Sequence, residues 1–224
     1  MKDDLEIDLE ELTSNPQARV PVCLCLDVSG SMEGEPLAEL NQGLRKFFSE
    51  VLQNKRARYA ADVCIVTFGD EVKQVVRFRS IESQDVPVLR ASGMTPMGQA
   101  VEHALDALEA RKRRLGKTGV DYYQPWLVLM TDGQPTDDIE PAVERVQRMV
   151  REKKLTVFPI AIGASADLAA LARFSAGRAP FQLRGFAFSE FFAWLSKSIV
   201  RVSASTLGSE VEMPPYKGWG SLDS

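Results

Sequence analysis

The chain has 224 residues, of which 45% are hydrophobic, 26% charged and 8% aromatic. This composition is typical of a globular protein and excludes a disordered, collagen-like or membrane-spanning chain. The formal net charge is −4, and the first twelve residues hold six acids and one Lys. The remaining residues carry 26 basic against 25 acidic side chains, so no clustered basic excess indicates a nucleic-acid partner. A single domain with a core of its own is expected at this length.

The N-terminal sequence and the cysteines indicate a cytoplasmic protein. The chain begins with acids rather than a basic and apolar signal, and no apolar run approaches the about 20 residues that span a bilayer. Three cysteines, an odd number, lie inside apolar stretches at Cys23, Cys25 and Cys64, which does not suit a secreted disulfide framework. With only one His in the chain, we expect buried thiols and no zinc site.

Short β-branched apolar runs alternate with helical patterns along the chain. This alternation predicts an α/β fold, a doubly wound and mostly parallel sheet with helices on both faces. A tight-turn signal at Gly69 and Asp70 separates the second and third runs, so the third is expected to be one antiparallel edge strand. The expected strands are residues 20–26, 61–68, 72–78, 126–130, 156–162 and 180–183.

Apolar residues spaced three and four apart mark the helices. They predict helices around residues 37–51, 101–108, 139–150, 167–174 and 189–200. Two basic runs, Arg111 to Arg114 and Arg151 to Lys154, each close a predicted helix and are expected to face water near the negative end of the helix dipole. No repeat or low-complexity linker divides the chain. We therefore expect an acidic arm at 1–18, a domain at 19–203 and a tail at 204–224, both ends forming arms.

The segment that carries chemistry, Asp27-Val28-Ser29-Gly30-Ser31, lies where the first strand ends and before the first helix. Ligands of doubly wound sheets bind at this carboxyl edge of the strands. An Asp followed by two hydroxyls at alternate positions offers three oxygen ligands from one short turn, and Gly30 lets the backbone present them together. The pattern predicts a site for a hard cation.

Two further segments can add oxygens to the same edge. The strand at 126–130 ends in Thr131-Asp132-Gly133, which delivers a second carboxylate, and the turn before the second helix offers the hydroxyl of Thr95. Mg²⁺ takes octahedral oxygen ligands and keeps several waters, so it suits a site with few protein oxygens and an open position. We expect Mg²⁺, with Mn²⁺ or Ca²⁺ as alternatives.

These five residues, Asp27, Ser29, Ser31, Thr95 and Asp132, resemble in order and context the metal-ion-dependent adhesion site of von Willebrand factor A domains. The resemblance covers about residues 19–200. The sequence around these residues resembles the bacterial TerY type of this domain, which is associated with tellurite resistance. The segments that carry this second likeness are NQGL at 41–44, SGMTPMGQA at 92–100, VLMTDGQPTDD at 128–138 and FFAWLSKSIVRVSAS at 191–205.

The resemblance implies a role for each site residue. Ser29 and Ser31 would ligate the ion directly, Thr95 directly or through water, and Asp27 and Asp132 would mainly hold ligated waters. A partner protein would then fill the open position with an Asp or Glu carboxylate, because neutral hydroxyls leave the charge of the ion poorly neutralised. The resemblance also implies a scaffold or adaptor in a bacterial stress or tellurite response, with a protein kinase and a protein phosphatase as partners.

An enzyme is the competing interpretation, because phosphatases of the haloacid-dehalogenase type also place an Asp at the end of the first strand. Asp27 would then be the nucleophile of a Mg²⁺-dependent hydrolase. That family needs a second Asp two residues on, where this chain has Ser29. The chain also has no phosphate-binding G-x-x-x-x-G-K-[ST] loop and no G-x-S-x-G elbow. We therefore expect a protein that is not an enzyme.

The N-terminal arm offers two readings of its own. Its acids alternate or nearly alternate with Leu5, Ile7, Leu9 and Leu12. Like charges repel and short apolar positions bury little, so a solvated tail is one reading. The other is that the arm offers a carboxylate to the metal of a neighbouring copy, which would give a monomer with weak, metal-dependent self-association. Neither reading involves nucleic acid or a membrane.

Overall fold

The computed structural model describes residues 10–175, 179–216 and 219–222. A sheet of seven strands in the order β3-β2-β1-β4-β5-β6-β7 forms its centre. The five central strands, β2, β1, β4, β5 and β6, run parallel, and β3 and β7 are antiparallel at the two edges. The strands are β1 (Val20–Asp27), β2 (Ala61–Phe68), β3 (Lys73–Ser80), β4 (Trp126–Thr131), β5 (Thr156–Ala161), β6 (Phe181–Leu183) and β7 (Gly220–Leu222).

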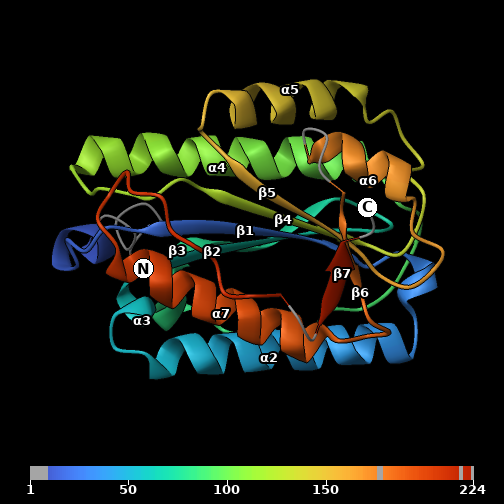
Figure 1. Cartoon of the computed structure of the whole chain (residues 1–224), viewed down its shortest axis with the longest axis horizontal. Coiled ribbons are helices and arrows are strands. Elements are labelled where there is room, and N and C mark those ends of the chain that lie inside the picture. The colour runs from blue at the N-terminus through green and yellow to red at the C-terminus, as the bar shows by residue number, and fades with distance from the viewer. Residues whose placement is uncertain (1–9, 176–178, 217–218, 223–224) are drawn as a thin grey trace, which may run out of the picture.

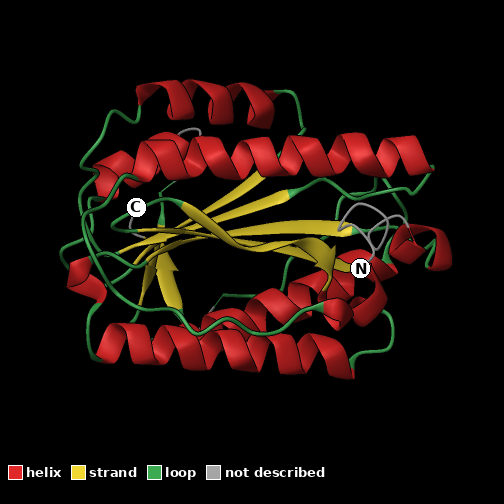
Figure 2. Cartoon of the chain, turned by 180° about the vertical axis from the view of Figure 1, so that it is seen from behind, coloured by secondary structure: helices red, strands yellow, loops and turns green. Residues whose placement is uncertain are grey.

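Helices cover both faces of this sheet (Figures 1 and 2). On one face lie α4 (Met97–Thr118), α5 (Glu140–Arg151) and α6 (Leu168–Phe174), and on the other lie α2 (Glu35–Gln53), α3 (Ala57–Ala60) and α7 (Phe188–Ala204). Two short 3₁₀ turns, η1 (Gly30–Met32) and η2 (Ile81–Ser83), are also present. The prediction of a doubly wound α/β fold is therefore confirmed.

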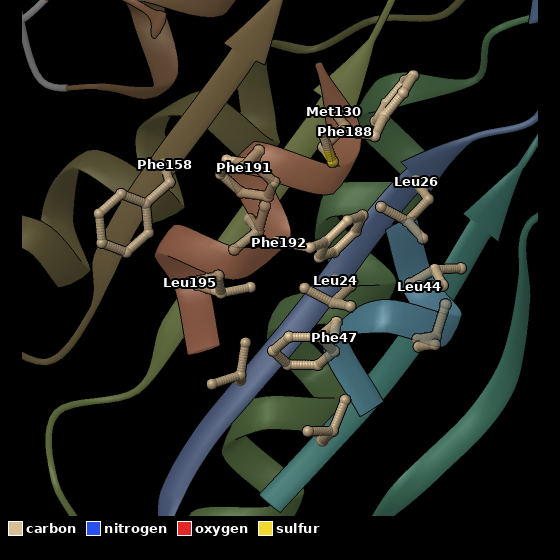
Figure 3. Close-up of a cluster of buried hydrophobic side chains, with 14 of the residues drawn as sticks. Leu24, Leu26, Leu44, Phe47, Met130, Phe158, Phe188, Phe191, Phe192 and Leu195 are labelled. Carbon is tan, nitrogen blue, oxygen red and sulfur yellow. The ribbon is translucent and has the colours of Figure 1, made fainter. Parts of the chain in front are cut away.

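Because both faces are covered, β1, β2 and β4 are buried along their whole length. Successive residues of β1 enter opposite cores. Leu24 and Leu26 join the cluster under α2 and α7, and Cys23 and Cys25 join the cluster under α4, α5 and α6. Figure 3 shows the first cluster, where phenylalanines of α2 and α7 lie over β1. Cys64 is likewise buried and all three thiols are free, as predicted.

The expected strands each lie within two residues of the observed bounds, and β3 pairs antiparallel with β2 at the edge, as the turn at Gly69 and Asp70 predicted. The structure adds one strand. β7 pairs antiparallel with β6 at the opposite edge, so the sheet has two antiparallel edge strands where the sequence predicted one. The cause is Trp219, which is buried against the rings of Phe181 and Phe191 at centroid distances of 5.3 and 5.0 Å.

The N-terminal arm also makes contacts with the domain. Residues 10–14 are helical, and Leu12 is buried against Leu115 and Val120 at the end of α4. Glu11 accepts a hydrogen bond from the Ser80 amide at 2.8 Å. Residues 1–9, which hold four of the six acids of the arm, lie outside the described residues. The hypothesis about their carboxylates therefore stays a prediction.

One expectation about the basic runs is wrong. Arg111 does not face water: it is buried under the sheet, and its Nε lies 2.6 Å from Oδ2 of Asp62 at the start of β2. The helix turns Arg111 inward because Leu108 and Leu115, one turn before and after, pack on the same side. Arg113, in contrast, is exposed.

No helix within the described ranges combines the length and the apolar character needed to cross a membrane.

Candidate metal site

The end of the sheet brings the first carboxylate into place. β1 ends at Asp27, and its parallel neighbour β4 ends at Thr131. Leu26 lies opposite Met130 in the register of the two strands, so these two ends lie side by side. Thr131 Oγ1 donates a hydrogen bond to Asp27 Oδ2 at 2.5 Å and accepts one from the Gly133 amide at 3.2 Å. Thr131 therefore fixes Asp27 and starts the turn that carries the second carboxylate.

The turn after β1 connects the two carboxylates through hydroxyl groups. The other Asp27 oxygen, Oδ1, accepts from the Ser29 amide at 2.8 Å. The 3₁₀ turn η1 then places Ser29 Oγ and Ser31 Oγ 3.1 Å apart, and Ser31 Oγ donates to Asp132 Oδ1 at 2.7 Å. Four of the five predicted residues thus form one hydrogen-bonded series, in which the Ser29 amide provides the bond to Asp27.

Thr95, the fifth residue, comes from the loop before α4. The amide of Gly30 donates to the carbonyl of Gly93 at 3.0 Å, which joins this loop to the turn after β1. A Cβ built on Gly133 would lie 3.5 Å from Thr95 Oγ1, so the threonine hydroxyl borders the Asp132 turn. The structure therefore brings all five predicted residues to the carboxyl edge of the sheet.

The site is acidic and largely withdrawn from water. Asp27 is fully buried, Ser29, Thr95 and Asp132 are also buried, and Ser31 is exposed. Burial raises the pKa of Asp27, hydrogen bonds from Ser29 and Thr131 lower it, and the charge of Asp132 raises it again. Among the described residues, no Lys or Arg forms an ion pair with either carboxylate.

This set of donors fits a hard divalent cation. Its members are carboxylate and hydroxyl oxygens, the ligands that Mg²⁺ and Mn²⁺ accept, whereas zinc and copper sites usually draw on thiolates and imidazoles. The described residues contain no group of three or more His, Cys, Asp and Glu side chains that could hold a metal ion, so the hydroxyls are required to complete a cation site. A bound cation would also offset the cost of burying two neighbouring carboxylates.

Sequence reasoning missed three residues that support the site. Thr131 was read only as part of the turn, although it bonds Asp27. Ser165 follows β5 and donates to the backbone carbonyl of Asp132 at 2.9 Å. Asp137 lies just before α5 (Glu140–Arg151) in the chain, yet its carboxylate accepts from amides at the start of α4. Asp138 does bond to the Glu140 amide at the start of α5.

In a comparison with protein families, the model of the von Willebrand factor type A domain matches residues 22–194. A search of curated proteins gives no match. Among solved structures, a von Willebrand factor type A protein from Catenulispora acidiphila superposes with a TM-score of 0.60 at 18% identity. That match covers 83% of this chain and 43% of the other.

Two further solved structures share this fold. Proximal thread matrix protein 1 from the mussel byssus, with a zinc-occupied metal-ion-dependent adhesion site, gives a TM-score of 0.54 at 18% identity over 82% of this chain and 48% of its own. Manganese-loaded TRAP protein of Plasmodium vivax gives 0.53 at 20% identity over 71% of this chain and 63% of its own. The chain thus spans about half the length of these proteins.

Proposed function

Because the chain belongs to the von Willebrand factor type A family, we propose that it is a metal-dependent protein-binding module that takes a carboxylate from its partner. One observation carries the proposal. Two buried carboxylates, Asp27 and Asp132, are connected through the Ser29 amide and the hydroxyls of Ser29 and Ser31, with no Lys or Arg paired to them among the described residues. A cation is the group that would complete this arrangement.

The five site residues have different roles in holding the cation. Ser29, Ser31 and Thr95 would hold the cation through neutral oxygens, and Asp27 and Asp132 would hold its waters. Asp27 is kept in one orientation, since Ser29 and Thr131 bond its two oxygens separately. When bound, Mg²⁺ supplies a positive charge that neutral hydroxyls neutralise poorly, and this charge favours an anionic oxygen from outside.

Mg²⁺ is the proposed ion, with Mn²⁺ and Ca²⁺ as alternatives. The finer biological assignment is a cytoplasmic scaffold or adaptor of a bacterial stress or tellurite response, with a protein kinase and a protein phosphatase as partners. This assignment is supported by the amino-acid sequence of four segments, which resembles the TerY type. The segments are 41–44, 92–100, 128–138 and 191–205.

We further propose that the protein is not an enzyme. A phosphatase of the haloacid-dehalogenase type needs an attacking carboxylate oxygen that can reach a phosphorus atom. Both oxygens of Asp27 already accept hydrogen bonds, and the side chain is fully buried. Phosphatase turnover that Asp27→Asn abolishes, and that survives removal of co-purifying enzymes, would contradict this part of the proposal.

Calorimetry of the full chain with Mn²⁺, together with thermal unfolding in Mg²⁺ and in EDTA, tests the metal site. Ion at about a hundredfold excess over Kd should stabilise the protein by about 2.7 kcal/mol. Ser29→Ala and Ser31→Ala should reduce both the heat and the stabilisation, whereas Ser83→Ala, on the exposed turn η2, should not. Equal binding by all four proteins would contradict the assignment.

The carboxylate of the partner is tested with peptides. Arrays whose members carry a central Asp in varied surroundings are compared with arrays that carry Asn at that position. Selective binding of Asp peptides in Mg²⁺, lost in EDTA and in Asp132→Asn, supports the proposal. Binding that ignores both the metal and the carboxylate contradicts it.

The same logic tests self-association through the N-terminal arm. Replacing Asp3, Asp4, Glu6 and Asp8 by Asn or Gln leaves the packed residues 10–14 unchanged. Sedimentation of both proteins with and without Mg²⁺ should show a weak, metal-dependent dimer for the natural chain alone. An identical mass in all four samples would leave the arm without a role as ligand.

A further inference from the structure

On the basis of the proposed metal site, we propose that Asp137 is a positioning residue that holds Thr95 against the Asp132 side of the site. Asp132 and Asp137 belong to the same connection between β4 and α5. Thr95 belongs to a different loop, so a contact between the two segments is required to set their spacing. Asp137 supplies that contact.

The start of α4 shows why such a contact exists. The first amides of a helix have no partner within the helix, and a side chain at the N-cap position usually accepts from them. Here the N-cap is Pro96, which provides no side-chain acceptor. Asp137 replaces it from outside: Oδ1 accepts from the Gly98 amide at 2.9 Å and Oδ2 from the Gln99 amide at 2.8 Å. A carboxylate also suits the positive end of the helix dipole.

A second connection reaches Thr95 itself. The Thr136 amide donates to the carbonyl of Thr95 at 2.9 Å, and the Thr95 amide donates to Thr136 Oγ1 at 3.1 Å. Thr95 is therefore bonded through its main chain, which leaves its side-chain hydroxyl to face the site. Together, Thr136 and Asp137 bind the residues on both sides of Pro96.

The close approach depends on a glycine. A Cβ on Gly98 would lie 2.3 Å from the carbonyl oxygen of Asp138 and 3.1 Å from Oδ2 of Asp137. The first of these distances is too short for any side chain, and the obstacle is backbone. Gly98 thus allows the 132–138 connection to lie directly on the first turn of α4, and a methyl group there would separate the two segments.

The expected effect is on the metal rather than on the fold alone. Ser29 and Ser31 share one turn with Asp27, so their spacing is set locally. Thr95 and Asp132 come from separate segments, and their spacing depends on the contact described. Loss of a group that orients a metal ligand typically weakens metal binding by about 10–100-fold.

The test measures Mn²⁺ affinity of the full chain by calorimetry, well below the unfolding temperature. Asp137→Ala should weaken binding about tenfold, and Asp137→Asn, which keeps one acceptor oxygen, should have a smaller effect. The matched control is Asp138→Ala, because Asp138 makes a similar bond to the Glu140 amide at 2.9 Å but does not contact α4 through its side chain. Unfolding in EDTA measures how far each substitution lowers the free energy of unfolding of the metal-free protein.

A double-mutant cycle with Thr95→Ala separates positioning from general destabilisation. If Asp137 acts through Thr95, Asp137→Ala should weaken Mn²⁺ binding in the natural background and have little further effect once Thr95 is Ala. Gly98→Ala should follow the same pattern. Equal Mn²⁺ affinity in Asp137→Ala and the natural chain, additive losses in the cycle, or an equal loss in Asp138→Ala would each overturn the proposal. Failure of the natural chain to bind Mn²⁺ would instead contradict the proposed function.

Discussion

Buried and half-buried carboxylates have different partners at the two ends of the sheet. At the amino ends of the parallel strands, Asp62 pairs with the guanidinium of Arg111, and Oε1 of Glu11 lies 3.8 Å from Nη2 of Arg19. At the carboxyl ends, Asp27 and Asp132 bond only to hydroxyl groups and amides among the described residues. The right-hand side of Figure 1 is the metal-site end, and the described N-terminal helix lies at the other.

This difference distinguishes a structural charge from a functional one. A buried carboxylate that has its own arginine is already neutralised and contributes to the fold. A pair of carboxylates without such a partner carries an electrostatic cost in the absence of a cation, and sites that are costly to the fold are where function is usually found. The expected effects of replacing Arg111 and of replacing Asp27 therefore differ in sign.

The largest effect is expected at the amino ends. Arg111→Leu leaves the buried carboxylate of Asp62 without its guanidinium, and breaking a buried pair in this way costs about 3–5 kcal/mol. Urea unfolding measures it, with the exposed Arg113→Leu as the control, which should change the free energy of unfolding by less than about 0.5 kcal/mol. Replacing both Asp62 and Arg111 by Leu should recover much of the loss. Equal stability of Arg111→Leu and Arg113→Leu would remove the distinction between the two ends.

An effect of opposite sign is expected at the metal end. Asp27→Asn keeps an acceptor for the Ser29 amide and removes a carboxyl whose pKa burial raises. A raised pKa means that ionisation costs stability once the pH exceeds it, so the neutral Asn avoids that cost at neutral pH. In EDTA we expect a gain of about 0.5–2 kcal/mol, the range of common stabilising substitutions. Mn²⁺ binding should be lost at the same time, and a loss of stability in EDTA would contradict the interpretation.

The smallest effect concerns Glu11. Burial raises the pKa of this carboxyl, the Ser80 amide lowers it, and Asp62 raises it again. Because the pKa is raised in the fold, the associated stability is present below the ordinary value of 4.5 and is lost as the pH rises through the raised value. Glu11→Gln should lack this loss, so its free energy of unfolding should fall less between mildly acidic and neutral pH.

Urea unfolding over a pH series measures the Glu11 effect, and Glu190→Gln, on the exposed side of α7, is the control. If natural chain and Glu11→Gln give parallel curves, Arg19 already neutralises Glu11 completely. The comparison between the ends of the sheet would then become sharper, because Asp62 and Glu11 would both be balanced by a cation.

Much of the fold was readable from local patterns. β1, β2 and β4 are continuous apolar runs because helices cover both faces, and the turn at Gly69 and Asp70 indicated the antiparallel edge strand β3. The five predicted site residues were also readable, since the carboxyl ends of parallel strands meet at one edge of the sheet. Each of these inferences uses residues that are close in sequence or a rule of topology.

Other features depend on distant segments and carry no local signal. Arg111 was read as a helix-closing surface cation, and only the packing of α4 against β2 turns it toward Asp62. Trp219 lies within the segment 204–224 that the sequence predicted as a tail. Three aromatic rings distant in sequence, those of Phe181, Phe191 and Trp194, nevertheless pack against it next to the edge strand β7.

At the metal-site end, too, some features follow from the local sequence and others depend on contacts between distant segments. The sequence by itself determined which oxygens reach the carboxyl edge, because strand ends and turn residues place Asp27, Ser29, Ser31 and Asp132 there. Only the tertiary structure decided how Thr95 is held, because Asp137 bonds to the first turn of a helix that precedes it in the chain. Helix capping from outside depends on which loop lies over the helix start, and that is settled when the layers of the fold pack together.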